Sequence, residues 1–114
     1  MSDIKVRTIF IFKEYFSDYY KKQSLKVKEK IILTFRLIEQ IEHVPEEFLK
    51  HLEGTVDLYE IKIKQGGNSF RILCFFNKGR FIVVGNGFQK KSQKTPKNEI
   101  SKAYKIREEY EKEK

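Results

Sequence analysis

Residues 58–88 read LYEIKIKQGGNSFRILCFFNKGRFIVVGNGF. Their first part alternates strictly, with Tyr59, Ile61 and Ile63 on one face and Glu60, Lys62 and Lys64 on the other, which predicts a strand with one packed and one wet, basic face. Residues 69–77 are apolar on both faces and predict a central strand. Lys78-Gly79 is a short hairpin connection into a third strand over residues 80–88. Three successive antiparallel strands therefore decide the fold.

The flanking segments predict another strand and three helices. Residues 4–11 alternate and end in a β-branched run, while aromatic residues at three- and four-residue spacing predict a helix over residues 12–22. Ser24 is a suitable cap for a second helix, which Pro45 ends. Thr95 is predicted to cap a last helix that has Pro96 at its first position. The order β-α-α-β-β-β-α predicts a single α+β domain over residues 1–114, with a mainly antiparallel sheet, two N-terminal helices on one face and a C-terminal helix.

Composition excludes several classes of protein. The 114 residues are 39% hydrophobic and 14% aromatic, enough to bury a core without staples. Cys74 is the sole cysteine and sits in an apolar run, which excludes an internal disulfide, argues against a cysteine-based zinc site and predicts a buried side chain. No window approaches 18 uncharged apolar residues, and no basic N-terminal region precedes an apolar stretch. We therefore expect a cytoplasmic protein with no membrane association.

The positive charge is concentrated in one stretch. Between Glu60 and Glu99 there are nine lysines and arginines and no acidic residue, whereas the rest of the chain holds 15 basic and 16 acidic side chains. The net charge of +8 therefore comes from this stretch. So localised a field predicts a polyanionic partner, most simply a nucleic acid.

Arg71 stands near the start of the central apolar strand. Burying a guanidinium costs several kcal/mol unless it is paired. Either a carboxylate from Glu53, Asp57 or Glu60 meets it, or a substrate phosphate does, since the planar fork of arginine matches phosphate oxygens.

The lysines that follow the last strand could form a phosphate clamp with the amides at the start of the final helix. They are Lys90, Lys91, Lys94 and Lys97. Alternatively, they form an ordinary solvated loop.

The end of the last strand offers further candidates, each with a plain alternative. Gly85 and Gly87 would let a nucleotide backbone approach while Phe88 stacks on a base, or Phe88 belongs to the core. His43 and His51 could serve as acid or base, or they are ordinary loop residues.

Four segments together resemble a known family: Leu52-Glu53-Gly54, residues 58–62 (LYEIK), Phe70-Arg71-Ile72-Leu73 and residues 87–96 (GFQKKSQKTP). They are similar to the RelE/HigB-type toxins of bacterial type II toxin-antitoxin modules, in particular the phage-derived Gp49-like branch. The resemblance covers nearly the full chain and implies the small RelE-like fold, with the same order of strands and helices.

The resemblance implies a ribosome-dependent mRNA interferase, a toxin that cleaves messages in the ribosomal A site without a metal or other cofactor. By match to the family's strand arginine, Arg71 would stabilise the phosphate, and Lys90 or Lys91 would transfer the proton. The flanking phosphates or ribosomal RNA would be held by Lys62, Lys64, Lys94 and Lys97, with Phe88 stacking on a base.

The resemblance also implies a cognate antitoxin, commonly a helix-turn-helix protein of the HigA type, so that DNA is contacted only through the toxin-antitoxin complex. Two other functions stay open. The same fold hosts ParE-like poisons of DNA gyrase, and a plain RNA-binding domain would bind phosphates without cleaving them.

Overall fold

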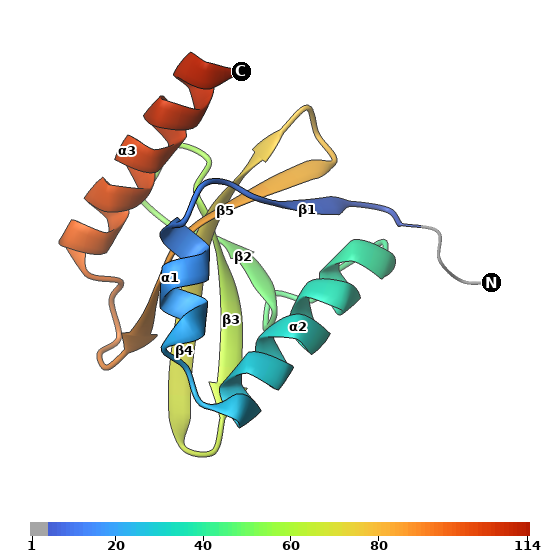
Figure 1. Cartoon of the computed structure of the whole chain (residues 1–114), viewed down its shortest axis with the longest axis vertical. Coiled ribbons are helices and arrows are strands. Elements are labelled where there is room, and N and C mark those ends of the chain that lie inside the picture. The colour runs from blue at the N-terminus through green and yellow to red at the C-terminus, as the bar shows by residue number, and fades with distance from the viewer. Residues whose placement is uncertain (1–4) are drawn as a thin grey trace.

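The computed structural model describes residues 5–114 and has a five-stranded mixed sheet with three helices (Figure 1). In chain order the elements are β1 (Thr8–Ile11), α1 (Tyr15–Lys21), α2 (Leu25–Gln40), β2 (Leu49–His51), β3 (Tyr59–Gln65), β4 (Asn68–Asn77), β5 (Phe81–Lys90) and α3 (Lys97–Glu113). The sheet order is β1-β5-β4-β3-β2, in which β1 runs parallel to β5 and every other neighbouring pair is antiparallel. The predicted α+β class is confirmed, and β4 is the central strand.

The structure corrects several predicted elements, among them the strand predicted over residues 4–11, which begins at Thr8; residue 4 lies outside the described residues. The short strand β2, which pairs with β3 through Lys50 opposite Glu60, was not predicted. Helix α2 ends at Gln40, earlier than the prediction that Pro45 ends it. The N-cap of α3 is Pro96, whose carbonyl accepts hydrogen bonds from two backbone amides of the first turn, so Thr95 is not the cap.

Two hydrophobic cores lie on opposite faces of the sheet. Helices α1 and α2 cover one face, where Ile31 and Ile38 pack against β-strand residues that include Ile72 and Cys74. Helix α3 covers part of the other face, where Ile106 packs near Leu73. The prediction that Cys74 is buried is confirmed, since it is 1% exposed and burial raises the pKa of its thiol. The central strand therefore supplies side chains to both cores, as its two apolar faces predict.

Local capping fixes where α2 begins. The Ser24 hydroxyl accepts a hydrogen bond from the Val27 amide at 3.3 Å, which satisfies one of the free donors at the helix start. This confirms the predicted cap.

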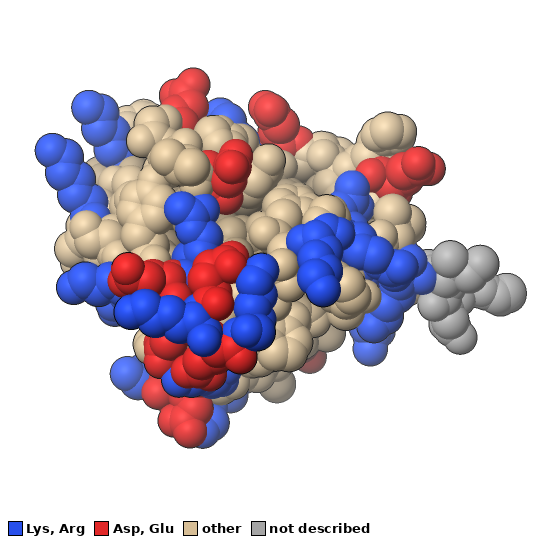
Figure 2. All heavy atoms as spheres, turned by 90° about the horizontal axis from the view of Figure 1, so that it is seen from above, with Lys and Arg blue, Asp and Glu red and all other residues tan. Residues whose placement is uncertain are grey.

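Helix α3 is attached at both ends. Near its start, the buried Asn86 amide donates to the carbonyl and to the carboxylate of Glu99, at 3.0 and 2.9 Å. Near its end, Lys13 forms ion pairs with Glu109 and Glu113. Figure 2 views the end of the molecule where α3 finishes, and acidic side chains lie there among basic ones. No helix within residues 5–114 has both the length and the apolar content that a membrane crossing requires.

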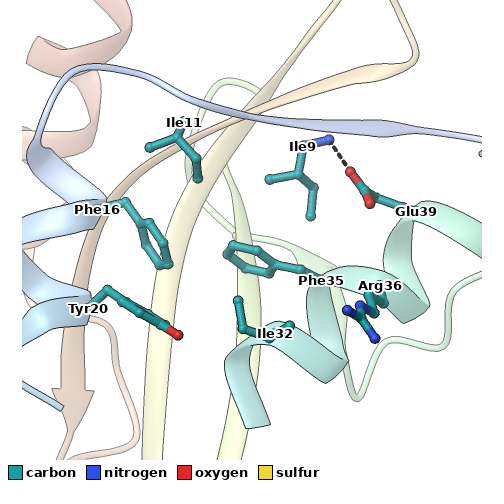
Figure 3. Close-up of a pocket in the computed structure, with 8 residues that line it drawn as sticks. All are labelled: Ile9, Ile11, Phe16, Tyr20, Ile32, Phe35, Arg36 and Glu39. Carbon is teal, nitrogen blue, oxygen red and sulfur yellow. Dashed lines mark hydrogen bonds between the residues drawn. The ribbon is translucent and has the colours of Figure 1, made fainter. Parts of the chain in front are cut away.

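An apolar hollow of about 360 Å³ opens between β1, α1 and α2 (Figure 3). Phe16 and Tyr20 of α1 line it from one side and Phe35 of α2 from the other. At its rim the Glu39 carboxylate accepts a hydrogen bond from the Ile9 amide at 2.9 Å, which caps a donor on the edge strand. Apart from Arg36 and Glu39, the residues that line this hollow are aromatic and aliphatic.

Candidate nucleic-acid interface

The part of the second sheet face that α3 leaves open is basic. Because β-strand side chains alternate, Glu60, Lys62 and Lys64 of β3 lie on the face opposite α1 and α2. Arg71 of β4 is the cross-strand partner of Lys62, and Lys90 of β5 lies opposite Ser69, two residues before Arg71 on β4. Three neighbouring strands thus place their charged side chains together, beside the start of α3.

Arg71 is buried and paired with Glu60. Its Nε lies 3.0 Å from Oε1 of Glu60 in an ion-pair contact that lies outside hydrogen-bond geometry, and the two side chains are only 10% and 7% exposed. Its Nη1 donates to the backbone carbonyl of Phe70 at 3.1 Å. The carboxylate partner that the sequence offered for Arg71 is therefore present, and it is Glu60. This ion pair uses the Nε edge of the guanidinium, which leaves the Nη2 nitrogen with no protein acceptor among residues 5–114.

Three hollows meet at Arg71. The first, of about 580 Å³, extends toward the start of α3 and is lined by Lys50, Lys62, Lys90, Lys94 and Lys97, with Glu60 and Arg71. The second, of about 660 Å³, extends along the end of β5 past Lys64, Lys90 and Lys91. The third, of about 350 Å³, lies beside Lys30, Lys62 and Lys64. Because Arg71 lines all three, an extended polyanion could cross its guanidinium and meet lysines on either side.

Lys62 has an altered acidity. Burial lowers the pKa of its ammonium group; the Glu60 carboxylate opposes this effect, while the charges of Lys50, Arg71 and Lys90 add to it. A lysine with a lowered pKa loses its proton more readily, as a general base must. Sequence reasoning placed Lys62 among the phosphate-binding residues. The feature that could have indicated a base is the position of Lys62 on the polar face of β3, where it is the cross-strand partner of Arg71.

All the predicted lysines of the site line these hollows: Lys62, Lys64, Lys90, Lys91, Lys94 and Lys97. Lys90 is half-buried at the end of β5, and Lys91 next to it is exposed. The sequence-based prediction missed Lys30 and Lys50, which lie outside the acid-free stretch and are brought to the site by α2 and by the unpredicted strand β2.

Phe88 does not offer a stacking surface. It is 9% exposed and packs in the core between the sheet and α3, the α3-side core, so the core alternative is the one observed. The predicted role of the glycines is also corrected. A Cβ on Gly87 would lie 2.5 Å from the ring of Tyr19, and a Cβ on Gly85 would lie 3.3 Å from Ile106. These glycines make room for side chains of α1 and α3 instead of for a nucleotide.

The two histidines lie in different surroundings. His51 ends β2, contacts the Tyr59 ring edge to face at a centroid distance of 5.2 Å and lines the first hollow. His43 is exposed in the turn after α2 and lines none of the three hollows, as the loop alternative predicts. Within residues 5–114, histidine, cysteine and acidic side chains nowhere gather in a group of three that could hold a metal ion.

The family model for the phage-derived Gp49-like proteins (DUF891) matches residues 18–108. The chain belongs to this family. Gp49-like proteins are a RelE/HigB-like toxin family, so the resemblance of the sequence to this family is confirmed. The matched range contains Arg71, Glu60 and every lysine of the three hollows. A search of curated proteins finds no match to this Gp49-like chain.

Proposed function

We propose that this Gp49-like protein is the toxin of a type II toxin-antitoxin module and cleaves mRNA on the ribosome. Family membership supports a toxin. The observation that carries cleavage is the position of the Arg71 guanidinium, buried at the meeting point of three lysine-lined hollows and directly across the sheet from Lys62, whose pKa is lowered. A fixed cation beside a potential base is what transfer of an RNA phosphate requires.

The proposed reaction uses the RNA's own 2′-hydroxyl. Lys62, in its deprotonated form, accepts the proton of this hydroxyl while the O2′–P bond forms, and the P–O5′ bond breaks to leave a 2′,3′-cyclic phosphate. Arg71 stabilises the charge on the phosphoryl oxygens through its Nη nitrogens. The ammonium of Lys90 or Lys91 gives the departing O5′ its proton. The remaining lysines hold the flanking phosphates or ribosomal RNA.

The proposed partners follow from the family. We propose a cognate antitoxin, of the helix-turn-helix HigA type, as the protein that silences the toxin in the cytoplasm. DNA would then be contacted through the antitoxin in the complex.

The test is an induction experiment that maps new mRNA 5′ ends by primer extension, with a translated message and with the same message lacking its start codon. Lys62→Arg keeps the positive charge but removes the base, and Arg71→Lys keeps the charge but removes the fork. We expect the wild type to make translation-dependent cuts and each variant to cleave about 10²- to 10⁴-fold more slowly. Lys105→Ala on the exposed face of α3 is the matched control and should cleave like the wild type.

Other outcomes would assign a different function. Growth arrest with intact mRNA and halted DNA replication would replace the interferase with a gyrase poison. Salt-dependent RNA binding without cleavage would make the protein a plain RNA-binding domain.

A further inference from the structure

An acidic residue lies inside the basic site, where its own charge opposes binding of a polyanion. Glu60 is 6% exposed, and its cross-strand neighbours are Lys50 on β2 and Leu73 on β4. Its carboxylate reaches diagonally to Nε of Arg71 at 3.0 Å. A buried carboxylate in the middle of a phosphate-binding surface needs a reason, because a neutral residue there would leave the surface more attractive to RNA.

The geometry of the pair supplies that reason. Nε is the guanidinium nitrogen nearest the backbone, so a carboxylate bound there restrains the rotation of the group. The Phe70 carbonyl restrains Nη1 in addition. With these two contacts made, Nη2 is free of protein acceptors among residues 5–114, and Arg71 borders all three hollows. An arginine without the carboxylate could turn its fork along the sheet, away from the position of a bound phosphate.

We propose that Glu60 is a positioning residue of the cleavage site: its carboxylate fixes the Arg71 guanidinium so that the Nη edge faces a bound phosphate. This inference rests on the proposed function. Glu60 does not touch the RNA and acts through Arg71 and, by its charge, through Lys62.

The charge of Glu60 has a second consequence, at Lys62. The carboxylate raises the pKa of Lys62 against the larger lowering effect of burial. Most charged groups that face Lys62 from neighbouring elements are cations: Lys30, Lys50, Lys64, Arg71, Lys90, Lys94 and Lys97, with His51 as a titratable ring. The acids facing it besides Glu60 are Glu47 and Glu53, and both are exposed and screened by water. Glu60 is therefore the acid with the strongest influence on the protonation of Lys62.

Two substitutions separate the two effects. Glu60→Gln keeps a polar side chain of nearly the same size and shape beside Nε of Arg71 but removes the charge. We therefore expect it to retain most of the cleavage rate and to shift the rising limb of the pH-rate profile to lower pH, because Lys62 then loses its proton more readily. Glu60→Ala removes both, and a misplaced Arg71 should slow single-turnover cleavage about 100-fold. Glu108→Gln, an exposed acid on α3, is the control for loss of one negative charge and should leave the rate and the profile unchanged.

The experiment combines this cleavage assay on programmed ribosomes with an NMR titration of the Lys62 side chain in the free wild-type and Glu60→Gln proteins. A lower Lys62 midpoint in Glu60→Gln, with the matching shift in the pH-rate profile, would support the inference. If the wild type cleaves and both Glu60 variants match it in rate and profile, the positioning role is overturned while the proposed function stands. If the wild type does not cleave, the proposed function fails, and an unchanged Lys62 midpoint would show separately that Glu60 does not control that proton. If Glu60→Ala fails to fold, the cleavage rate, the pH-rate profile and the Lys62 titration of Glu60→Gln still test the positioning role.

Discussion

The buried ion pair between Arg71 and Glu60 gives the sharpest prediction about stability. Because the two side chains are only 10% and 7% exposed, water screens the pair far less than it would a surface pair. Removing one partner leaves the other charge buried and unpaired, which costs about 3–5 kcal/mol. This is a large part of the roughly 5–15 kcal/mol that stabilises a typical domain. Either Arg71→Ala or Glu60→Ala should therefore be severely destabilised.

The double variant Arg71→Ala/Glu60→Ala leaves no buried charge behind. Its free energy of unfolding should consequently lie well above the value obtained by adding the two single losses, with a coupling energy of about 2–3 kcal/mol. Urea unfolding of the four proteins, followed by circular dichroism at one pH, measures this coupling. The control cycle uses Lys13→Ala and Glu113→Ala, an ion pair whose side chains are 41% and 49% exposed, and should give a coupling far smaller than the buried pair. If the Arg71 and Glu60 losses add to within about 0.5 kcal/mol, the pair does not stabilise the fold and the reasoning is refuted.

Three further predictions test other parts of the structure. Gly87→Ala should destabilise the protein by about 1–3 kcal/mol in urea unfolding, because its new methyl would overlap the Tyr19 ring; Gly67→Ala, with no atom within 4 Å of its Cβ, is the control and should cost much less. Partial burial raises the pKa of Tyr19 from 10.0 to about 12, so the unfolded state loses this proton first and wild-type stability should fall as the pH rises from 10 to 12. Tyr19→Phe should lose less stability over that range in a pH series of thermal melts, and an equal loss would contradict the assignment. Lys64→Ala should weaken RNA binding and reduce the slope of log K against log salt by about 0.7, and an unchanged slope would remove Lys64 from the phosphate contacts.

The sequence predicts most of the fold because its signals are local. The alternation in residues 58–64 assigns Glu60 and Lys62 to the face opposite the helices without knowledge of any partner strand. Strand β2 has only three residues, too few for a periodic pattern, and it is defined by pairing with β3. Its absence from the prediction also removed Lys50 from the predicted site.

The sequence limits the partner of Arg71 to a few carboxylates but does not decide which of them forms the ion pair. Glu53, Asp57 and Glu60 were all close to Arg71's strand in the chain. Of these, only Glu60 lies on the same face of β3 as Lys62, which is the cross-strand neighbour of Arg71. The lowered pKa of Lys62 also arises from tertiary structure. It depends on burial and on the charges of Lys50 and Lys90, which the sheet brings to it from two other strands.

The position of Lys90 depends on an irregularity in β5 that a strict period of two cannot foresee. Val83 packs in the α3-side core, so uninterrupted alternation would turn Phe88 and Lys90 toward α1 and α2. The register with β4 shifts in between: Cys74 pairs with Val84, whereas Ile72 pairs with Gly87, so β5 has one more residue than β4 over this interval. This bulge reverses the faces, which places Phe88 in the α3-side core and Lys90 beside Arg71. The correction at Phe88 and the assembly of the basic site therefore have the same cause, since the extra residue that buries the ring also brings Lys90 to the face of Arg71 and Lys62.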